Sequence, residues 1–424
     1  MNRTLYTNAR LMDPASGLDS HGSLLVRDGR IADLGNDLSP QDNDETVDCG
    51  GRILCPGFID MRAHGVQIDA ALKGGITTLI LQPTQTTLID TDAVVERIRR
   101  RAADTGRLNI YPMGAATKRA QGLEISEIGQ MQAAGAVAFT DGRKAVADAR
   151  VMRRLMEYAG HFGALIVQFA EEPQLAEGGV AHEGETAMRL GLPGIPSAAE
   201  VIQIERDLRL LEITGGRLHF ALLSSRAGVE AVRAAKARGA RVSASVAPPY
   251  LHLNESAVEG YRSFARLTPP LRSEEDRLAL VQGLADGTID TIVSDHDPKA
   301  EDQKRLPFSQ AAPGVIGLET MLALSLSLVH AGKLPLMRVL DALTSRPADL
   351  LGLSSGRLAV DAPADLTIFD PNKPWRIERE AFGPNGNNTP FDTLPVQGRV
   401  WRTVVAGRTV YGDQAGAVTG PAGC

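Results

Sequence analysis

The sequence has few aromatic residues, no basic block and no long apolar run. Aromatic side chains make up 4% of its 424 residues, so the stacking platforms that bind single-stranded nucleic acid are scarce. The net charge is −6, and a mildly acidic chain without clustered cations is a poor phosphate binder. No apolar run reaches the ~18 residues that cross a bilayer, and the first residues lack a signal-peptide core. We therefore expect neither nucleic acid nor a membrane as a partner.

Cysteine is also scarce. The three cysteines, Cys49, Cys55 and Cys424, form no C-x-x-C pair and cannot all be joined in disulfides. A reducing cytoplasm is therefore the expected compartment. Neither a G-x-G-x-x-G motif nor a P-loop follows a predicted strand, which weighs against a nucleotide-binding sheet.

The two ends of the chain predict short β-strands. Two apolar runs within 23–35 are joined by Asp28-Gly29, which is a hairpin signal. The segments 364–370 and 402–411 have the same texture. Because each end is too short to fold well alone, we expect the two ends to form one small sheet together.

The long middle of the chain alternates buried apolar runs with helical stretches. The predicted strands are 77–82, 136–141, 164–169, 218–224, 241–246 and 291–295. The predicted helices are 147–159, 198–213, 228–237 and 278–285. This βα alternation is typical of a parallel barrel or a doubly wound sheet, and the missing nucleotide motifs favour the barrel. Two segments rich in glycine and proline, 183–196 and 382–390, predict long loops.

From Pro56-Gly-Phe-Ile-Asp-Met onward, collinear motifs cover nearly the whole chain. They are Gly74-Gly-Ile-Thr-Thr, Ala134-Gly-Ala-Val-Ala-Phe-Thr-Asp, His182-Glu-Gly-Glu, Gly194-Ile-Pro, Pro269-Pro-Leu-Arg, Asp286-Gly-Thr-Ile-Asp, Ser294-Asp-His-Asp-Pro, Gly317-Leu-Glu-Thr, Leu343-Thr-Ser-Arg-Pro-Ala, Ala364-Asp-Leu and Asn388-Thr-Pro-Phe. Through them the sequence resembles the amidohydrolase superfamily, and specifically the dihydroorotases. The resemblance implies an α/β fold: a (β/α)8 TIM-type barrel over 56–351 with a small β-sandwich built from 1–55 and 352–424.

Members of this family hydrolyse or close a cyclic amide with one or two zinc ions, which polarise the carbonyl and generate hydroxide near neutral pH. By resemblance, the His-x-His of the first strand is Arg62-Ala63-His64 here. A guanidinium has no lone pair to give a metal, so one ligand is lost. The bridging carboxylate or carboxylated lysine is assigned to Asp141.

Two further ligand positions are changed. The histidine expected on the third strand is Gln168, and the second histidine of His-x-x-His-x-Ser is Leu222. Only Asp295 stands where the family places its metal-binding, proton-shuttling aspartate. If one zinc ion is retained, the resemblance gives it His64, Asp141 and Asp295, with Asp295 also a vestigial general base.

The substrate side departs from the family as well. Val66 stands where an arginine would hold the substrate carboxylate, and Thr84 and Thr268 replace two asparagines. An anionic substrate would be left unpaired without this clamp. Arg62 and Gln168 are candidates to hydrogen-bond one another or Asp295 across the altered site, with the guanidinium standing in for a cation.

Three hypotheses follow. The preferred one is a non-catalytic dihydroorotase-like chain of pyrimidine biosynthesis, without a cofactor, that forms at least a homodimer and associates with the aspartate transcarbamoylase catalytic chain, as the resemblance implies. The second is an active dihydroorotase or other cyclic amidohydrolase with one zinc ion, to which Asp297, Lys299 or Glu171 supplies an unusual donor. The third is a self-assembling or signalling pseudoenzyme, similar to the dihydropyrimidinase-like proteins.

Overall fold

The computed structural model describes residues 3–36, 38–41, 44–84, 86–383 and 386–412. Within these ranges no helix combines the length and the apolar character that a membrane span needs. Cys49 and Cys55 are buried free thiols, and Cys424 lies outside the described residues.

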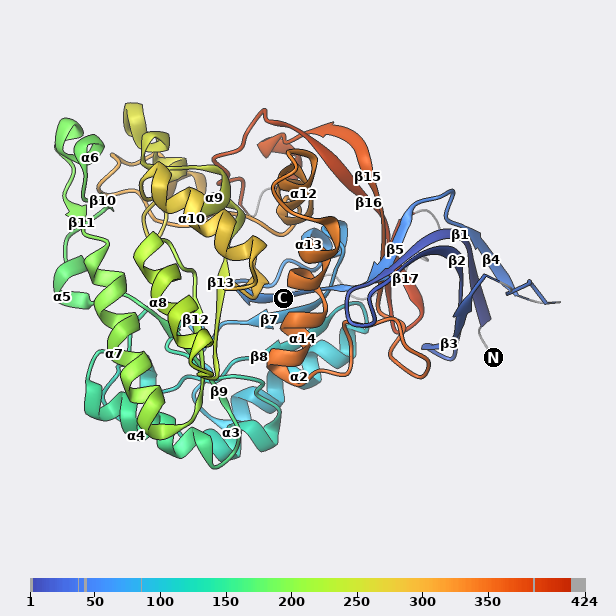
Figure 1. Ribbon diagram of the computed structural model, residues 1–424, viewed down its shortest axis with the longest axis horizontal. Coiled ribbons are helices and arrows are strands. Elements are labelled where there is room, and N and C mark those ends of the chain that lie inside the picture. The colour runs from blue at the N-terminus through green and yellow to red at the C-terminus, as the bar shows by residue number, and fades with distance from the viewer. Residues whose placement is uncertain (1–2, 37, 42–43, 85, 384–385, 413–424) are drawn as a thin grey trace.

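A closed barrel of parallel strands forms the larger part of the molecule (Figure 1). Its strands are β6 (Phe58–Ala63), β7 (Ile76–Leu81), β8 (Asn109–Pro112), β9 (Leu165–Phe169), β12 (Arg217–Ala221), β13 (Val242–Val246) and β14 (Thr291–Ile292). Strands β6–β7–β8 form one parallel sheet and β9–β12–β13–β14 form another. Phe139 joins the two sheets by bridging Gly114 and Ile166, and a parallel bridge between Ala63 and His296 closes the ring. Seven strands and the Phe139 segment therefore give the eight strand positions of the predicted barrel.

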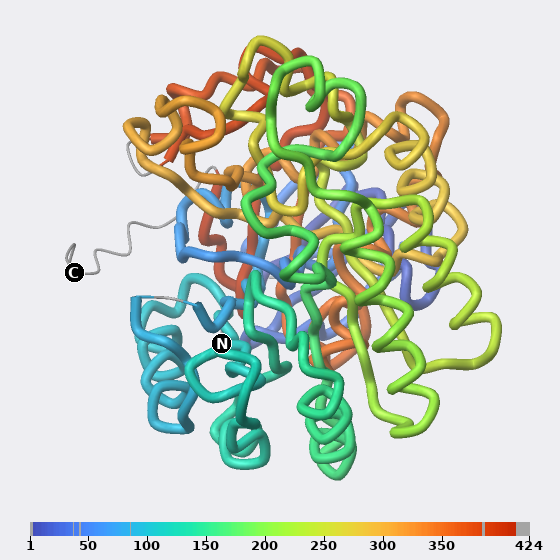
Figure 2. Tube along the Cα trace, turned by 90° about the vertical axis from the view of Figure 1, so that its left-hand side faces the viewer, coloured from blue at the N-terminus to red at the C-terminus, as the bar shows by residue number. Residues whose placement is uncertain are grey.

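Helices surround the barrel, as the view in Figure 2 shows. They are α1 (Ile68–Lys73), α2 (Asp92–Thr105), α3 (Ile128–Ala134), α4 (Ala149–Gly160), α5 (Pro173–Ala176), α6 (Glu185–Leu190), α7 (Ala198–Thr214), α8 (Arg226–Ala237), α9 (Pro248–His252), α10 (Glu274–Ala285), α11 (Glu301–Lys304), α12 (Met321–His330), α13 (Leu336–Leu343) and α14 (Ser345–Leu351). The four predicted helices correspond to α4, α7, α8 and α10.

Helix α4 shows why these segments are helical. The Asp148 carboxylate caps its first turn by accepting hydrogen bonds from the backbone N–H groups of Arg150 and Val151. Its buried side chains recur at spacings of three and four residues, which puts them on one face against the barrel. They are Met152, Leu155, Met156 and Ala159.

Strands from both ends of the chain form one eight-stranded sheet beside the barrel (Figure 1). They are β1 (Arg3–Asp13), β2 (Leu18–Arg27), β3 (Arg30–Gly35), β4 (Glu45–Asp48), β5 (Ile53–Pro56), β15 (Leu366–Arg376), β16 (Pro395–Val405) and β17 (Arg408–Tyr411). Strand β5 pairs with β1 on one side and with β15 on the other, which joins the two ends. The hairpin expected at Asp28-Gly29 is confirmed between β2 and β3. The domain limits 1–55, 56–351 and 352–424 stay a prediction.

Two sequence expectations differ from the structure in detail. The predicted strand 136–141 occupies the fourth strand position of the barrel, with backbone hydrogen bonds from residues 137–140 to both neighbours, but its bridges are confined to Phe139. The predicted loop 183–196 contains α6 and the short strand β11 (Gly194–Ile195), which pairs with β10 (Ala181–His182). Of the other predicted loop, 382–390, residues 384–385 lie outside the described part.

Candidate functional site

The carboxyl ends of the barrel strands bring the predicted site residues to one end of the barrel, where enzymes of this architecture keep their chemistry. Arg62 is the second-to-last residue of β6, and His64 directly follows that strand. Asp295 follows β14, with a left-handed backbone angle φ of +46°. Because β6 and β14 are neighbours in the closed ring, these three residues meet.

Two arginines hold the two oxygens of the Asp295 carboxylate. Nε of Arg62 lies 2.9 Å from Oδ1, and a terminal nitrogen of Arg143 lies 3.0 Å from Oδ2. The side chains of Arg62 and Asp295 are each 2% exposed, and that of Arg143 is 19% exposed. Charge-assisted bonds of this kind are strong where water is excluded.

Arg62 makes further contacts around the centre of the barrel. Its terminal nitrogens donate to the side-chain oxygen of Gln82 at 3.2 Å and to the carbonyl of Gly142 at 3.4 Å. Its guanidinium carbon lies 5.8 Å from the ring centroid of Phe169, at cation–π distance. Burial lowers the pKa of Arg62 and the Asp295 carboxylate raises it. The side chain therefore fills the space at the strand ends with a guanidinium.

Arg143 is the site residue that the sequence reasoning missed. Besides Asp295 it contacts Asp297 at 3.3 Å, the carbonyl of Thr268 at 3.3 Å and the ring of His64 at 3.3 Å. Its place two residues after Asp141, at the end of the fourth strand position, is the one sequence signal that could have drawn attention to it.

The His64 ring is engaged by charged neighbours. Its Nε2 lies 3.4 Å from Oδ1 of Asp295 and accepts a hydrogen bond from Nε of Arg143. Burial, reinforced by the charge of Arg143, lowers the pKa of His64 to about 4. The ring is therefore neutral at pH 7, and its Nε2 lone pair points to an arginine N–H.

The electrostatics make Asp295 a weak base. Burial raises the pKa of this carboxyl, but the positive charges of Arg143 and Arg62 outweigh it. The net effect holds the pKa of Asp295 well below its usual range. A general base works best with a pKa near the working pH, so this environment opposes the proton-shuttling role.

The Asp141 carboxylate is bound by Thr117 rather than by the arginines. Its two oxygens accept hydrogen bonds from the backbone N–H of Thr117 at 2.9 Å and the hydroxyl of Thr117 at 2.5 Å. Burial raises its pKa, while these bonds lower it. The structure therefore brings His64 and Asp295 together, whereas both oxygens of Asp141 bind a neighbouring loop.

The expected hydrogen bond of Arg62 to Asp295 is present, whereas the expected hydrogen bond of Gln168 to Arg62 or Asp295 is not. Gln168 accepts from the backbone N–H of Val146 at 3.1 Å and donates to Asp207 at 2.9 Å. Its strand, β9, occupies the fifth position of the barrel rather than the third. Side chains alternate along a strand, and the next residue, Phe169, is the one that faces Arg62.

The other altered positions surround this end of the barrel. Leu222 is buried directly after β12, with φ of +55°. Val66 is 42% exposed. Thr84 lies beside Gly142, where an added Cβ would come within 2.8 Å of its hydroxyl oxygen. Thr268 contributes its backbone carbonyl to Arg143.

The residues present do not fit a zinc ion. Zinc needs several histidine, cysteine or carboxylate donors at about 2.0–2.3 Å. Among the described residues, no group of three such side chains is placed to hold a metal. Of the proposed extra donors, Asp297 pairs with Arg143 and with Lys299, the latter at 2.8 Å. Two guanidinium groups on Asp295 would also repel a dication.

Comparison with known proteins identifies the family. A family model described as Dihydro-orotase-like matches residues 51–228, and one described as Amidohydrolase family matches residues 327–411. A dihydroorotase of Syntrophotalea carbinolica is 42% identical over 421 residues, covering 96% of this chain and 99% of its own. The chain belongs to the dihydroorotase family. A dihydroorotase of Anaplasma phagocytophilum is 41% identical over 424 residues, covering 96% of this chain and 94% of its own.

Solved structures agree with the fold of this dihydroorotase homologue. An L-hydantoinase (dihydropyrimidinase) from Arthrobacter aurescens superposes with a TM-score of 0.85 at 27% identity, covering 97% of this chain and 96% of that chain. A D-hydantoinase (dihydropyrimidinase) from Thermus sp. superposes with a TM-score of 0.80 at 23% identity, covering 97% and 95%. The amidohydrolase fold, a TIM-type barrel with a β-sandwich, is thereby confirmed.

Proposed function

We propose that this chain is a catalytically inactive dihydroorotase homologue that acts as a structural or regulatory partner of aspartate transcarbamoylase. The observation that carries the proposed inactivity is the occupation of both Asp295 oxygens by Arg62 and Arg143. A metal ion that generates hydroxide needs ligands with lone pairs and nearby negative charge. The two guanidinium groups supply neither.

The neighbouring side chains support the same proposal. The Phe169 ring faces Arg62 at the end of β9, and Leu222 is buried directly after β12. Neither hydrocarbon side chain can bind a metal. The lone pair of His64 is taken by Arg143. Without a metal hydroxide, hydrolysis of a cyclic amide would need an efficient general base to take a proton from the attacking water, and Asp295 has its pKa held low by two cations. The arginine cluster therefore disfavours both zinc-dependent hydrolysis and general-base catalysis by Asp295.

The partnership rests on the resemblance to dihydroorotase-like chains that lack zinc ligands and associate with aspartate transcarbamoylase. A docking role depends on the surface and the fold. It is therefore compatible with a barrel that keeps its core while its site changes. We also propose a homo-oligomer, at least a dimer, and a cytoplasmic location, which fits the buried free thiols of Cys49 and Cys55.

The partnership is tested by mixing the purified chain with the aspartate transcarbamoylase catalytic chain of the same organism. Size-exclusion chromatography with light scattering should give a complex larger than either component, and carbamoyl transfer should differ from that of the catalytic chain alone. Each component run separately is the control. Separate elution together with unchanged carbamoyl transfer would overturn the partnership.

An active dihydroorotase or other cyclic amidohydrolase with a single zinc ion is the alternative. It is favoured by the relatives that are 42% and 41% identical and are named dihydroorotase. Metal analysis of the purified chain separates the two proposals. The alternative requires one zinc ion per chain, lost in Asp295→Ala, whereas the preferred proposal expects a zinc content far below one ion per chain.

A further inference from the structure

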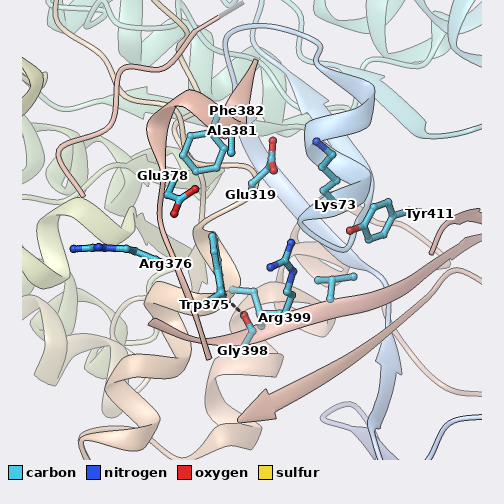
Figure 3. A pocket seen from close by; sticks show the side chains of 12 residues that line it. Lys73, Glu319, Trp375, Arg376, Glu378, Ala381, Phe382, Gly398, Arg399 and Tyr411 are labelled. Carbon is cyan, nitrogen blue, oxygen red and sulfur yellow. Dashed lines mark hydrogen bonds between the residues drawn. The ribbon is translucent and has the colours of Figure 1, made fainter. Parts of the chain in front are cut away.

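A cavity of about 220 Å³ lies between the barrel and the eight-stranded sheet, and none of its lining residues belongs to the arginine cluster (Figure 3). Its walls come from the last residue of α1, the segment before α12, the ends of β15 and β17 and the middle of β16. Junctions between structural units are common places for small-molecule sites. Its volume is below the ~300 Å³ at which pockets for drug-sized ligands begin, so a compact ligand is indicated.

Charged side chains of both signs line this cavity. Lys73 and Arg399 bring positive charge, and Glu319 and Glu378 bring negative charge. Figure 3 shows the Lys73 amine, the Arg399 guanidinium and the Glu319 carboxylate around the same space. Within the described part of the chain, the side chains of Lys73, Glu319 and Glu378 make no hydrogen bond and no ion pair.

An aromatic wall fixes the geometry beside these charges. The indole Nε1 of Trp375 donates to the carbonyl of Gly398 at 2.8 Å, which holds the ring in place. The guanidinium carbon of Arg399 lies 5.6 Å from the Trp375 ring centroid. The Tyr411 hydroxyl is directed toward the cavity in Figure 3 and adds a neutral donor and acceptor.

We propose that this cavity binds a compact zwitterion of the α-amino acid type, whose carboxylate pairs with Lys73 and Arg399 and whose ammonium pairs with Glu319. A simple anion would satisfy the two cations and leave Glu319 unpaired, and a simple cation would do the reverse. The partly buried Glu319 carboxyl supports this assignment. Burial raises its pKa by more than the charges of Lys73 and Arg399 lower it, and a ligand ammonium would offset the remainder.

Calorimetric titration of the purified full chain with each of the common L-amino acids tests the proposal. At least one amino acid should bind with a stoichiometry of one and a Kd below about 1 mM. Propionate and ethylammonium, each carrying one charge, should bind at least tenfold more weakly than that amino acid. If no amino acid gives saturable binding below about 10 mM, the proposal is wrong.

A matched pair of variants locates the site. Glu319→Gln should weaken binding of that amino acid by roughly 10- to 100-fold, because a charged hydrogen bond is lost. The exposed Glu380 lies outside the cavity wall, so Glu380→Gln should bind as the wild type does. Lys73→Met, at an exposed position, gives a second test that does not depend on the folding of Glu319→Gln. Unchanged affinity in Glu319→Gln and Lys73→Met would overturn the assignment, whatever the chain does with dihydroorotate or a partner protein.

Discussion

Nε of Arg62 lies 2.9 Å from Oδ1 of Asp295, so the first strand of the barrel is tied to the loop after the last strand by a buried ion pair. A second tie lies beside it, since Asp60 accepts a hydrogen bond from the backbone N–H of Ser294 at 3.0 Å. The altered site is therefore part of the closure of the barrel. An arginine in the place of a metal ligand supplies positive charge and hydrogen bonds without a bound ion.

Replacing Arg62 by methionine should destabilise the fold. The change leaves the buried Asp295 carboxylate with Arg143 as its remaining arginine partner, and breaking a buried pair costs about 3–5 kcal/mol. Urea unfolding measures the loss. Arg154→Met, at an exposed position, should stay within about 0.5 kcal/mol of the wild type. Equal stability of the two variants would mean that the Arg62–Asp295 pair contributes little.

Acid should destabilise the protein partly through His64. Its pKa is about 4 in the folded chain and about 6.5 when unfolded, so between these values the unfolded state binds more protons. Stability therefore falls as pH drops from 6.5 toward 4. In His64→Gln the fall between pH 7 and 4.5 should be shallower by roughly 2 kcal/mol, measured by urea unfolding at both pH values. If the wild type and His64→Gln gave parallel pH profiles, the buried and neutral state of the His64 ring would be contradicted.

Lys304 predicts the behaviour on the alkaline side. Its buried ammonium donates to the carbonyls of Ala312 at 2.9 Å and Gly314 at 3.3 Å, and burial lowers its pKa to about 7. Above pH 7 the unfolded state still holds this proton while the folded state loses it, so this group makes stability rise with pH.

The comparison with Lys304→Met isolates that contribution. Between pH 7 and 8.5 the wild type should gain about 1–2 kcal/mol relative to Lys304→Met, as read from urea midpoints. Lys333→Met, at an exposed position, should follow the wild type. The account of the buried ammonium fails if Lys304→Met shows the same pH dependence as the wild type.

Zinc should leave the thermal stability unchanged. A ligand that binds the folded state raises the unfolding temperature by an amount that grows with the ratio of its free concentration to its Kd, and the arginine cluster offers zinc no ligand set. Scanning calorimetry with equimolar zinc, and separately with a chelator, should give unfolding temperatures within about 1 °C of the metal-free scan. A rise of several degrees that Asp295→Ala abolishes would require a metal site at the barrel end.

The resemblance to the dihydroorotases predicted which residues of the barrel end would meet, and its limits are visible in β9. The family motifs assigned Arg62, His64 and Asp295 to one site, and the carboxyl ends of neighbouring barrel strands do bring these residues together. Assigning Gln168 instead of Phe169 to the interior was an error of one residue, and in a strand one residue reverses the face. Both side chains are compatible with a buried strand, so composition could not decide between them.

Arg143 escaped prediction for a different reason. It lies in a loop, and whether a long side chain turns into the barrel depends on the partners it meets there. The helix α6 was hidden because a glycine precedes it and several glycines and prolines follow it in 183–196. The β-sheet of the two ends was accessible from the sequence, since both ends carry short apolar runs and the hairpin carries Asp28-Gly29.

Dihydroorotate turnover by the purified chain, with and without added zinc, tests the central claim most directly. Asp295→Ala, purified in the same way, controls for traces of host dihydroorotase. The arginine-filled site predicts that the wild type shows no turnover above this control in either condition. Turnover that zinc supports and that Asp295→Ala abolishes would contradict it, and would mean that the Asp295 carboxylate serves catalysis rather than its arginine partners.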